Sequence, residues 1–197
     1  LDTGMGFVLV QHLDPVHDSA LPQLLGRATS LPVHEVTNNL RVEPNHVYVI
    51  PPNNSLSLTE GVLTLGPRPK TRTPNRSIDF FFEALANDQR DRAIGVILSG
   101  TATDGTVGLE SIKAEGGITL AQDDSARYDS MPRSAVAAGS VDFVLSPEDI
   151  AAELARIAKH PAVIGALSGS STQADGGRAS ATAHGNDGTP LPSGGGA

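Results

Sequence analysis

A histidine and an aspartate, His12 and Asp104, each follow a short apolar run of the kind that forms a buried strand. The runs are residues 6–10 and 93–98, and the second is apolar enough to predict burial on both faces of a parallel sheet. Parallel strands bring their carboxyl ends to one sheet edge, where open α/β proteins build catalytic sites. There a carboxylate can orient an imidazole that takes a proton from a nucleophile. The pair predicts general base catalysis, although each residue alone is also typical of a capping histidine or a turn-forming aspartate.

The elements that position this pair alternate between strand and helix. Strands are expected at residues 6–10, 47–50, 93–98, 117–121 and 141–145, with a hairpin pairing 55–59 and 62–65. Helices are expected at about 20–28, at 77–87 behind a Ser77 cap, from 106 onward, at Pro132, and from 146 to near 160. The first helix is expected to turn Leu21, Leu24 and Leu25 toward the core. This order predicts an α/β fold, a doubly wound and mostly parallel sheet with flanking helices and one β-hairpin.

Composition excludes several classes of function. The 197 residues carry a formal net charge of -8 with scattered basic residues, so no nucleic acid is expected as a partner. There is no cysteine for a thiolate site, and no apolar run approaches the ~20 residues that span a bilayer. We therefore expect a cytoplasmic protein without direct membrane insertion. Residues 1–161 are expected to form one domain and 162–197, rich in Gly, Ser, Thr, Ala and Pro, a flexible low-complexity tail or linker.

Three further polar residues have a structural and a functional interpretation. Arg133, in a Met-Pro-Arg sequence, can bond carbonyls in a crevice or an acidic flank of a substrate, or can simply open a helix. Asn75 and Arg76 end a basic loop and either line the same cleft or lie in solvent. The residue types alone leave both interpretations open.

Metal and nucleotide chemistry have less support. His17, His34 and His46 lack metal-ligand spacing and are expected to be surface or capping residues, so no metal is predicted. The glycines around Asp104 resemble a phosphate-binding turn, but G-x-G-x-x-G and the Walker lysine are both absent from the sequence. A small nucleotide-binding domain is therefore a third alternative only.

Four motifs occur in order along the chain. They are F-V-L-V-Q-H-L at 7–13, V-E-P-N-H-V-Y-V-I-P-P at 42–52, G-V-I-L-S-G-T-A-T-D-G-T-V-G-L at 95–109 and M-P-R-S-A at 131–135. Together they resemble the catalytic domain of the chemotaxis receptor methylesterases of CheB type, from the first residues to about Pro161. In that family a Ser-His-Asp triad hydrolyses glutamate γ-methyl esters on chemoreceptors and can deamidate certain glutamines.

The resemblance assigns roles to individual residues. It makes His12 the general base and then the general acid, and Asp104 the partner that orients it. The position associated with the oxyanion hole falls on Thr101, where the family often has methionine. No cofactor is implied. The implied partners are the cytoplasmic domains of methylated chemoreceptors and a receptor methyltransferase, either covalently linked or separate.

One part of the family pattern has no counterpart in this sequence. The family's nucleophilic serine lies in a Gly-Ala-Ser-x-Gly-Gly-like turn upstream of the Q-H strand, and no such motif occurs here. Ser99 is expected to be a structural residue at the end of its strand rather than a substitute nucleophile. Residues 1–197 alone are thus expected to be inactive and less stable than a chain extended at its amino terminus. The alternative is a non-catalytic module that docks a chemoreceptor or a methyltransferase.

Overall fold

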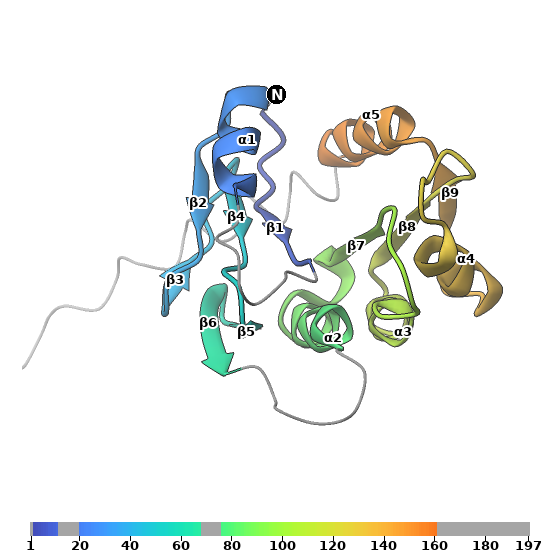
Figure 1. Cartoon of the computed structure of the whole chain (residues 1–197), viewed down its shortest axis with the longest axis horizontal. Helices are drawn as coiled ribbons and strands as arrows, with labels where there is room; N and C mark the ends of the chain where they lie inside the picture. The colour runs from blue at the N-terminus through green and yellow to red at the C-terminus, as the bar shows by residue number, and fades with distance from the viewer. Residues whose placement is uncertain (1, 12–19, 68–75, 161–197) are drawn as a thin grey trace, which may run out of the picture.

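The computed structural model describes residues 2–11, 20–67 and 76–160. Backbone hydrogen bonds join its strands into three sheets of three strands each. The first sheet is parallel, with its middle strand bonded to both others: β1 (Phe7–Leu9), β4 (Val47–Val49) and β2 (Val33–Glu35). Helix α1 (Leu21–Ala28) connects β1 to β2 in the chain order and packs beside β2 (Figure 1).

The second sheet is antiparallel and contains the expected hairpin. Its strands are β5 (Asn54–Thr59), β6 (Val62–Pro67) and the two-residue β3 (Leu40–Arg41), which the sequence did not predict. The hairpin turn consists of Glu60 and Gly61, both with positive φ, as the tight two-residue turn requires. The carboxylate of Asp88, from the far end of the following helix, accepts hydrogen bonds from both turn amides.

The third sheet is parallel and carries the helices that surround the candidate site. Its strands, in spatial order, are β7 (Ile94–Ile97), β8 (Ile118–Gln122) and β9 (Phe143–Leu145). The helices are α2 (Ser77–Gln89), α3 (Thr106–Ala114), α4 (Ser130–Ala137) and α5 (Pro147–Ala158), with a short 3-10 turn (Arg90–Arg92) after α2. In Figure 1, α5 lies above these strands and α3 below them, so helices cover both faces.

One hydrophobic core joins the three sheets. It contains Leu56 and Leu63 from the hairpin, Phe81 from α2, Ile97 from β7 and Leu109 from α3, all of them buried. The mostly parallel α/β architecture with flanking helices is therefore confirmed. The single continuous sheet is not observed among the described residues, because the strand pattern predicts direction but not which edges come close enough to bond.

Two apolar segments are less buried than the sequence predicts. Leu24 of α1 is 58% exposed, since α1 lies beside the edge strand β2, and the other two leucines of the expected apolar face, Leu21 and Leu25, are only partly covered. On β7 only one face is buried: Ile97 faces the core, whereas Val96 is partly exposed and Leu98 follows the end of the strand. Burial of β7 on both faces, the sequence-based prediction, is thus wrong.

The cap expected for α2 is also different. Ser77 lies inside the first turn, and its hydroxyl is buried with no hydrogen-bond partner among the described residues. The amides at the start of α2 are instead bonded by a carboxylate 26 residues further along the chain, that of Asp104. By contrast, α5 begins where expected and has a serine cap, because the Ser146 hydroxyl accepts from the Asp149 amide.

Asp142 ties β8 to α3 and to the turn before β9. Its Oδ2 accepts from the amide and the hydroxyl of buried Thr119 at 3.0 and 2.9 Å, and its Oδ1 lies 2.9 Å from Lys113 Nζ. Burial alone raises the pKa of Asp142, but the hydrogen bonds from Lys113 and Thr119 outweigh it and hold the pKa below its ordinary value of 3.8.

Asp142→Ala is expected to lower the free energy of unfolding at neutral pH by about 2 kcal/mol, since it removes charge-assisted hydrogen bonds from a buried partner. Because the folded pKa lies below the unfolded one, this contribution is complete above about pH 5 and is lost as the pH falls through the folded pKa. Urea unfolding from pH 7 down to about pH 2.5 measures it, with exposed Asp124→Ala as the control. A difference between wild type and D142A that does not shrink in acid would contradict the assignment.

Candidate active site

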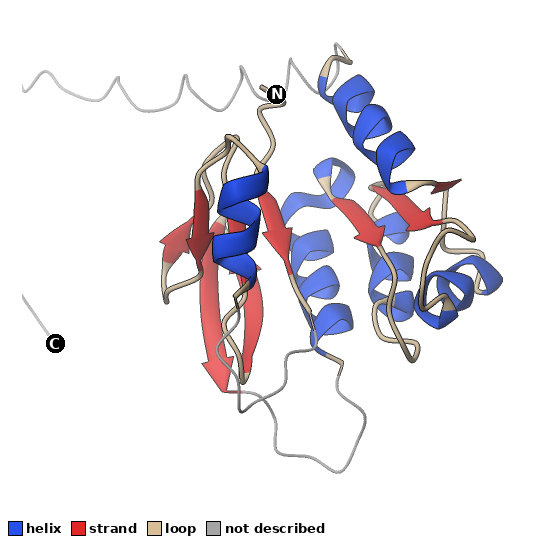
Figure 2. Cartoon of the chain, turned by 45° about the horizontal axis from the view of Figure 1, so that its top comes forward, coloured by secondary structure: helices blue, strands red, loops and turns tan. Residues whose placement is uncertain are grey.

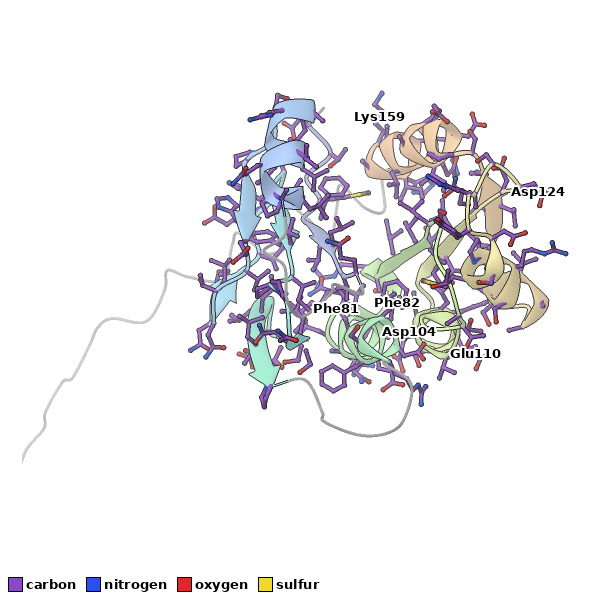
Figure 3. All side chains as sticks on the ribbon, viewed as in Figure 1. Phe81, Phe82, Asp104, Glu110, Asp124 and Lys159 are labelled. Atoms are coloured by element: carbon purple, nitrogen blue, oxygen red, sulfur yellow. The ribbon has the colours of Figure 1, made fainter. Side chains whose placement is uncertain are left out.

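Asp104 occupies the loop between the carboxyl end of β7 and the start of α3. Its carboxylate is buried, and the residue is 4% exposed. Oδ2 accepts from the Ile78 amide and Oδ1 from the Asp79 amide, both at 2.9 Å. Figure 3 shows Asp104 beside the α2 and α3 helices. The amino-terminal end of α2 therefore stabilises the negative charge of Asp104 and fixes the direction of its two oxygens.

Asp79 returns the same interaction in the other direction. It is 3% exposed, and its Oδ1 accepts from the amides of Gly105 and Gly108 at 2.9 and 2.8 Å. Its Oδ2 lies 3.0 Å from Nε of Arg76, and this hydrogen bond together with the Asp79 charge raises the pKa of Arg76. Sequence reasoning did not single out Asp79. An aspartate in the first turn of an expected helix was a visible signal, but it points to capping of its own helix.

The loop after β7 is braced by the loop after β8. Gln122 Oε1 accepts from the Ser99 amide at 2.9 Å, and the Gly100 amide donates to the Tyr128 carbonyl at 2.8 Å. The Ser99 hydroxyl accepts from the Tyr128 amide at 2.9 Å and donates to the Tyr128 carbonyl at 3.3 Å. These bonds support the structural role expected of Ser99.

Thr101 and Ala102 lie between this brace and Asp104, and both are exposed. Ala102 has φ of 71°, a left-handed conformation that a residue with a Cβ adopts only at some energetic cost. The loop between β7 and α3 is thus held at Ser99 and Gly100 on one side and at Asp104 on the other. Between these points it keeps an unfavourable backbone conformation.

Comparison of the chain with known proteins identifies its family. The family model described as CheB methylesterase matches residues 1–154. The chain belongs to the CheB methylesterase family. A solved structure, the CheB methylesterase catalytic domain of Thermotoga maritima, is 28% identical and superposes with a TM-score of 0.73 over 80% of this chain and 87% of the other. The sequence-based resemblance is confirmed.

Relatives in the CheB family differ widely in length. A putative protein-glutamate methylesterase/protein-glutamine glutaminase of Leptospira interrogans is 37% identical over 75% of this chain and 78% of its own. Protein-glutamate methylesterase/protein-glutamine glutaminase 3 of Pseudomonas aeruginosa is 35% identical, and the match covers 76% of this chain but 45% of that protein. An uncharacterized 104.1 kDa protein of Rhodobacter capsulatus is 40% identical over 66% of this chain and 14% of its own length.

His12, the other half of the predicted CheB pair, lies outside the described residues. The structure follows the chain as far as Gln11, two residues past the end of β1. Val8 and Val10 pack against the same core as Ile97 of β7, and β1 lies next to β7 in Figures 1 and 2. The described residues before His12 thus pack against the core to which the strand leading into Asp104 also contributes, and the contact between His12 and Asp104 stays a prediction.

Arg133 lies on α4, where its guanidinium is exposed and donates to Asp129 at 3.1 Å. It lines a cavity of about 590 Å³ together with Asp123 and Asp129. Gln122 lines the same cavity and bonds the loop after β7, so the cavity adjoins that loop. Asp129 is the ion-pair partner of Arg133, and a role of Arg133 in substrate binding stays a prediction.

His34, His46 and Arg76 have local partners in the structure. His46 Nδ1 lies 2.9 Å from the Pro44 carbonyl, and its ring centroid is 5.3 Å from that of His34. In the part of the chain that the structure describes, no three His, Cys, Asp or Glu side chains are grouped to hold a metal ion, and no helix has the length and apolarity to cross a membrane. Arg76 is largely exposed beside Asp79, while His17 and Asn75 lie outside the described residues.

Ala102→Gly is expected to raise the free energy of unfolding by about 1 kcal/mol, because glycine adopts positive φ without the steric cost that alanine meets. The matched control is Ala152→Gly, the same substitution at an exposed site within α5, which should lower it by about 1 kcal/mol. Thermal and urea unfolding of both variants provide the test. A destabilised A102G would show that the left-handed conformation carries no strain.

Proposed function

We propose that this CheB-family domain hydrolyses glutamate γ-methyl esters on chemoreceptors and deamidates certain glutamines by the same steps. The observation that carries the proposal is the buried Asp104 carboxylate, fixed by two helix amides at the carboxyl end of a strand. Two relatives whose names state both activities support it. The match covers 14% of the Rhodobacter capsulatus relative and 45% of the Pseudomonas aeruginosa relative, so the activity of the whole protein is part of this proposal.

In this mechanism the Asp104 carboxylate orients His12 through one ring nitrogen. The other ring nitrogen of His12 takes the proton of a serine hydroxyl supplied by the segment upstream of Leu1, and the serine oxygen attacks the ester carbonyl. Asp104 suits this role because its charge is stabilised by α2 and is retained while His12 becomes positive.

The negative charge that develops on the carbonyl oxygen requires hydrogen-bond donors. Residues near Thr101 are proposed to supply them from the backbone, since the loop is exposed there and braced on both sides. His12 then returns its proton to the leaving oxygen, and methanol departs as the acyl-serine forms. A water molecule repeats the steps and releases glutamate; with a glutamine substrate, ammonia takes the place of methanol. No cofactor enters these steps.

The proposed setting is the cytoplasm, where the domain acts on the cytoplasmic domains of methylated chemoreceptors. The proposed domain covers residues 1–161, and residues 162–197 are proposed to be a flexible tail or linker. A receptor methyltransferase, either covalently linked or separate, is a further proposed partner. The length of the 104.1 kDa Rhodobacter capsulatus relative, of which the match covers 14%, supports a domain that works within a larger protein. Arg133 is proposed to contact the substrate from the cavity beside Gln122.

His12→Ala and Asp104→Asn, each made in the full-length protein, are expected to lower the rate of methanol release from methylated receptor by about 10³-fold or more. The double variant should lose little beyond either single one, because the two residues act as a unit. Ser99→Ala is the control and should stay within about tenfold of wild type, since Ser99 only braces the loop. Wild-type rates in D104N would exclude the proposed role of Asp104.

Residues 1–197 alone are expected to release no methanol above background, whereas the full-length protein turns over, because the proposed serine lies upstream. Gas chromatography of methanol from radiolabelled receptor membranes measures both. Turnover by residues 1–197 would overturn the placement of the nucleophile. A full-length protein that binds methylated receptor but releases no methanol would instead support the non-catalytic docking module.

A further inference from the structure

The start of α2 and the start of α3 are joined by two carboxylates that each bond the other helix. Asp104, just before α3, accepts from the amides of Ile78 and Asp79 in the first turn of α2. Asp79 in turn accepts from the amides of Gly105 and Gly108 around the first turn of α3. All four bonds are buried and 2.8 to 2.9 Å long. The orientation of each carboxylate therefore depends on where the other helix starts.

The backbone at this junction leaves little room for adjustment. A Cβ added to Gly108 would lie 2.4 Å from Phe82 Cβ and 3.1 Å from Asp79 Cα, so α2 and α3 approach as closely as glycine permits. Gly105 has φ of 94°, which turns the chain directly from Asp104 into α3. A shift of the Gly105 turn would move the Asp104 backbone with it and lengthen the bonds that fix its side chain.

We infer that Asp79 is a positioning residue that sets the place and direction of the Asp104 carboxylate through the amides of Gly105 and Gly108. This inference rests on the proposed function, in which Asp104 orients His12. Asp79 needs no contact with substrate for this role. Its second oxygen bonds Arg76, which is largely exposed, so the Oδ1 side alone carries the effect.

If Asp79 only stabilised the fold, D79A would behave like any other variant of similar stability. The chain offers a matched control at the other end of α2, where the Asp88 carboxylate also accepts from two backbone amides, those of Glu60 and Gly61 in the hairpin turn. Asp88→Ala removes the same kind of interaction from the same helix without touching the Asp104 loop. Loss of stability alone should therefore affect D79A and D88A in the same way.

The experiment uses full-length protein, with methanol release measured over a range of methylated receptor concentrations and well below the melting temperature of each variant. D79A is expected to lower kcat by about 10- to 100-fold with KM within about twofold, because displacement of the orienting group affects the chemical step. D79N, which keeps an oxygen for Gly105 and Gly108, should recover most of kcat, and D88A should stay within about twofold of wild type. Should D79A not fold, D79S gives the same test, since its hydroxyl is too short to reach both amides.

Hydrogen exchange supplies a readout that does not depend on activity. In D79A the amides of residues 78 and 79 should exchange faster although their acceptor, Asp104, is intact, and in D88A they should keep wild-type protection. Wild-type kcat in D79A, or equal losses of kcat in D79A and D88A, would overturn the inference. Retained activity in D104N would instead contradict the proposed function. Failure of the inference about Asp79 and failure of the proposed function are therefore distinguishable.

Discussion

The candidate site depends on two carboxylates, Asp79 and Asp104, each of which accepts hydrogen bonds from the amides at the start of the other's helix. Two helix amino-terminal ends that meet in a buried region bring together several amides without helical partners and two like partial charges. Each carboxylate accepts hydrogen bonds from two of these amides and offsets the positive partial charge at the start of the neighbouring helix. The sheet edge therefore holds the buried Asp104 carboxylate with both of its oxygens bonded to amides at the start of α2.

A second set of contacts fixes the same loop from the opposite side. Gln122 and the backbone of Tyr128 hold Ser99 and Gly100, so the loop after β7 is bonded to the loop after β8 as well as to α2. The exposed residues Thr101 and Ala102 lie between these two anchors. These bonds explain how the loop retains positive φ at Ala102. Together they stabilise the loop by more than the conformational strain of one residue costs.

Much of the fold could be predicted from the sequence because strand and helix periods are local signals. The strands near 47–50 and 117–121, the hairpin and the helix that begins after Ser146 all lie where the pattern places them. The position of Asp104 at a strand end followed from the same pattern. Long-range partners could not be predicted in this way: Ser77 was expected to cap α2, whereas Asp104 bonds the Ile78 amide from 26 positions further along the chain. Asp79 was overlooked for the same reason, since its bonds cross to another helix.

The carboxylate of Asp104, fixed between α2 and α3, is proposed to be the group that holds His12. A crystal structure of the full-length protein tests this most directly through the separation of His12 and Asp104. We expect a ring nitrogen of His12 within about 2.7–3.2 Å of an Asp104 carboxylate oxygen, with the other ring nitrogen facing a serine hydroxyl. A His12 ring on another side of the molecule, with Asp104 bonded only to helix amides, would contradict it.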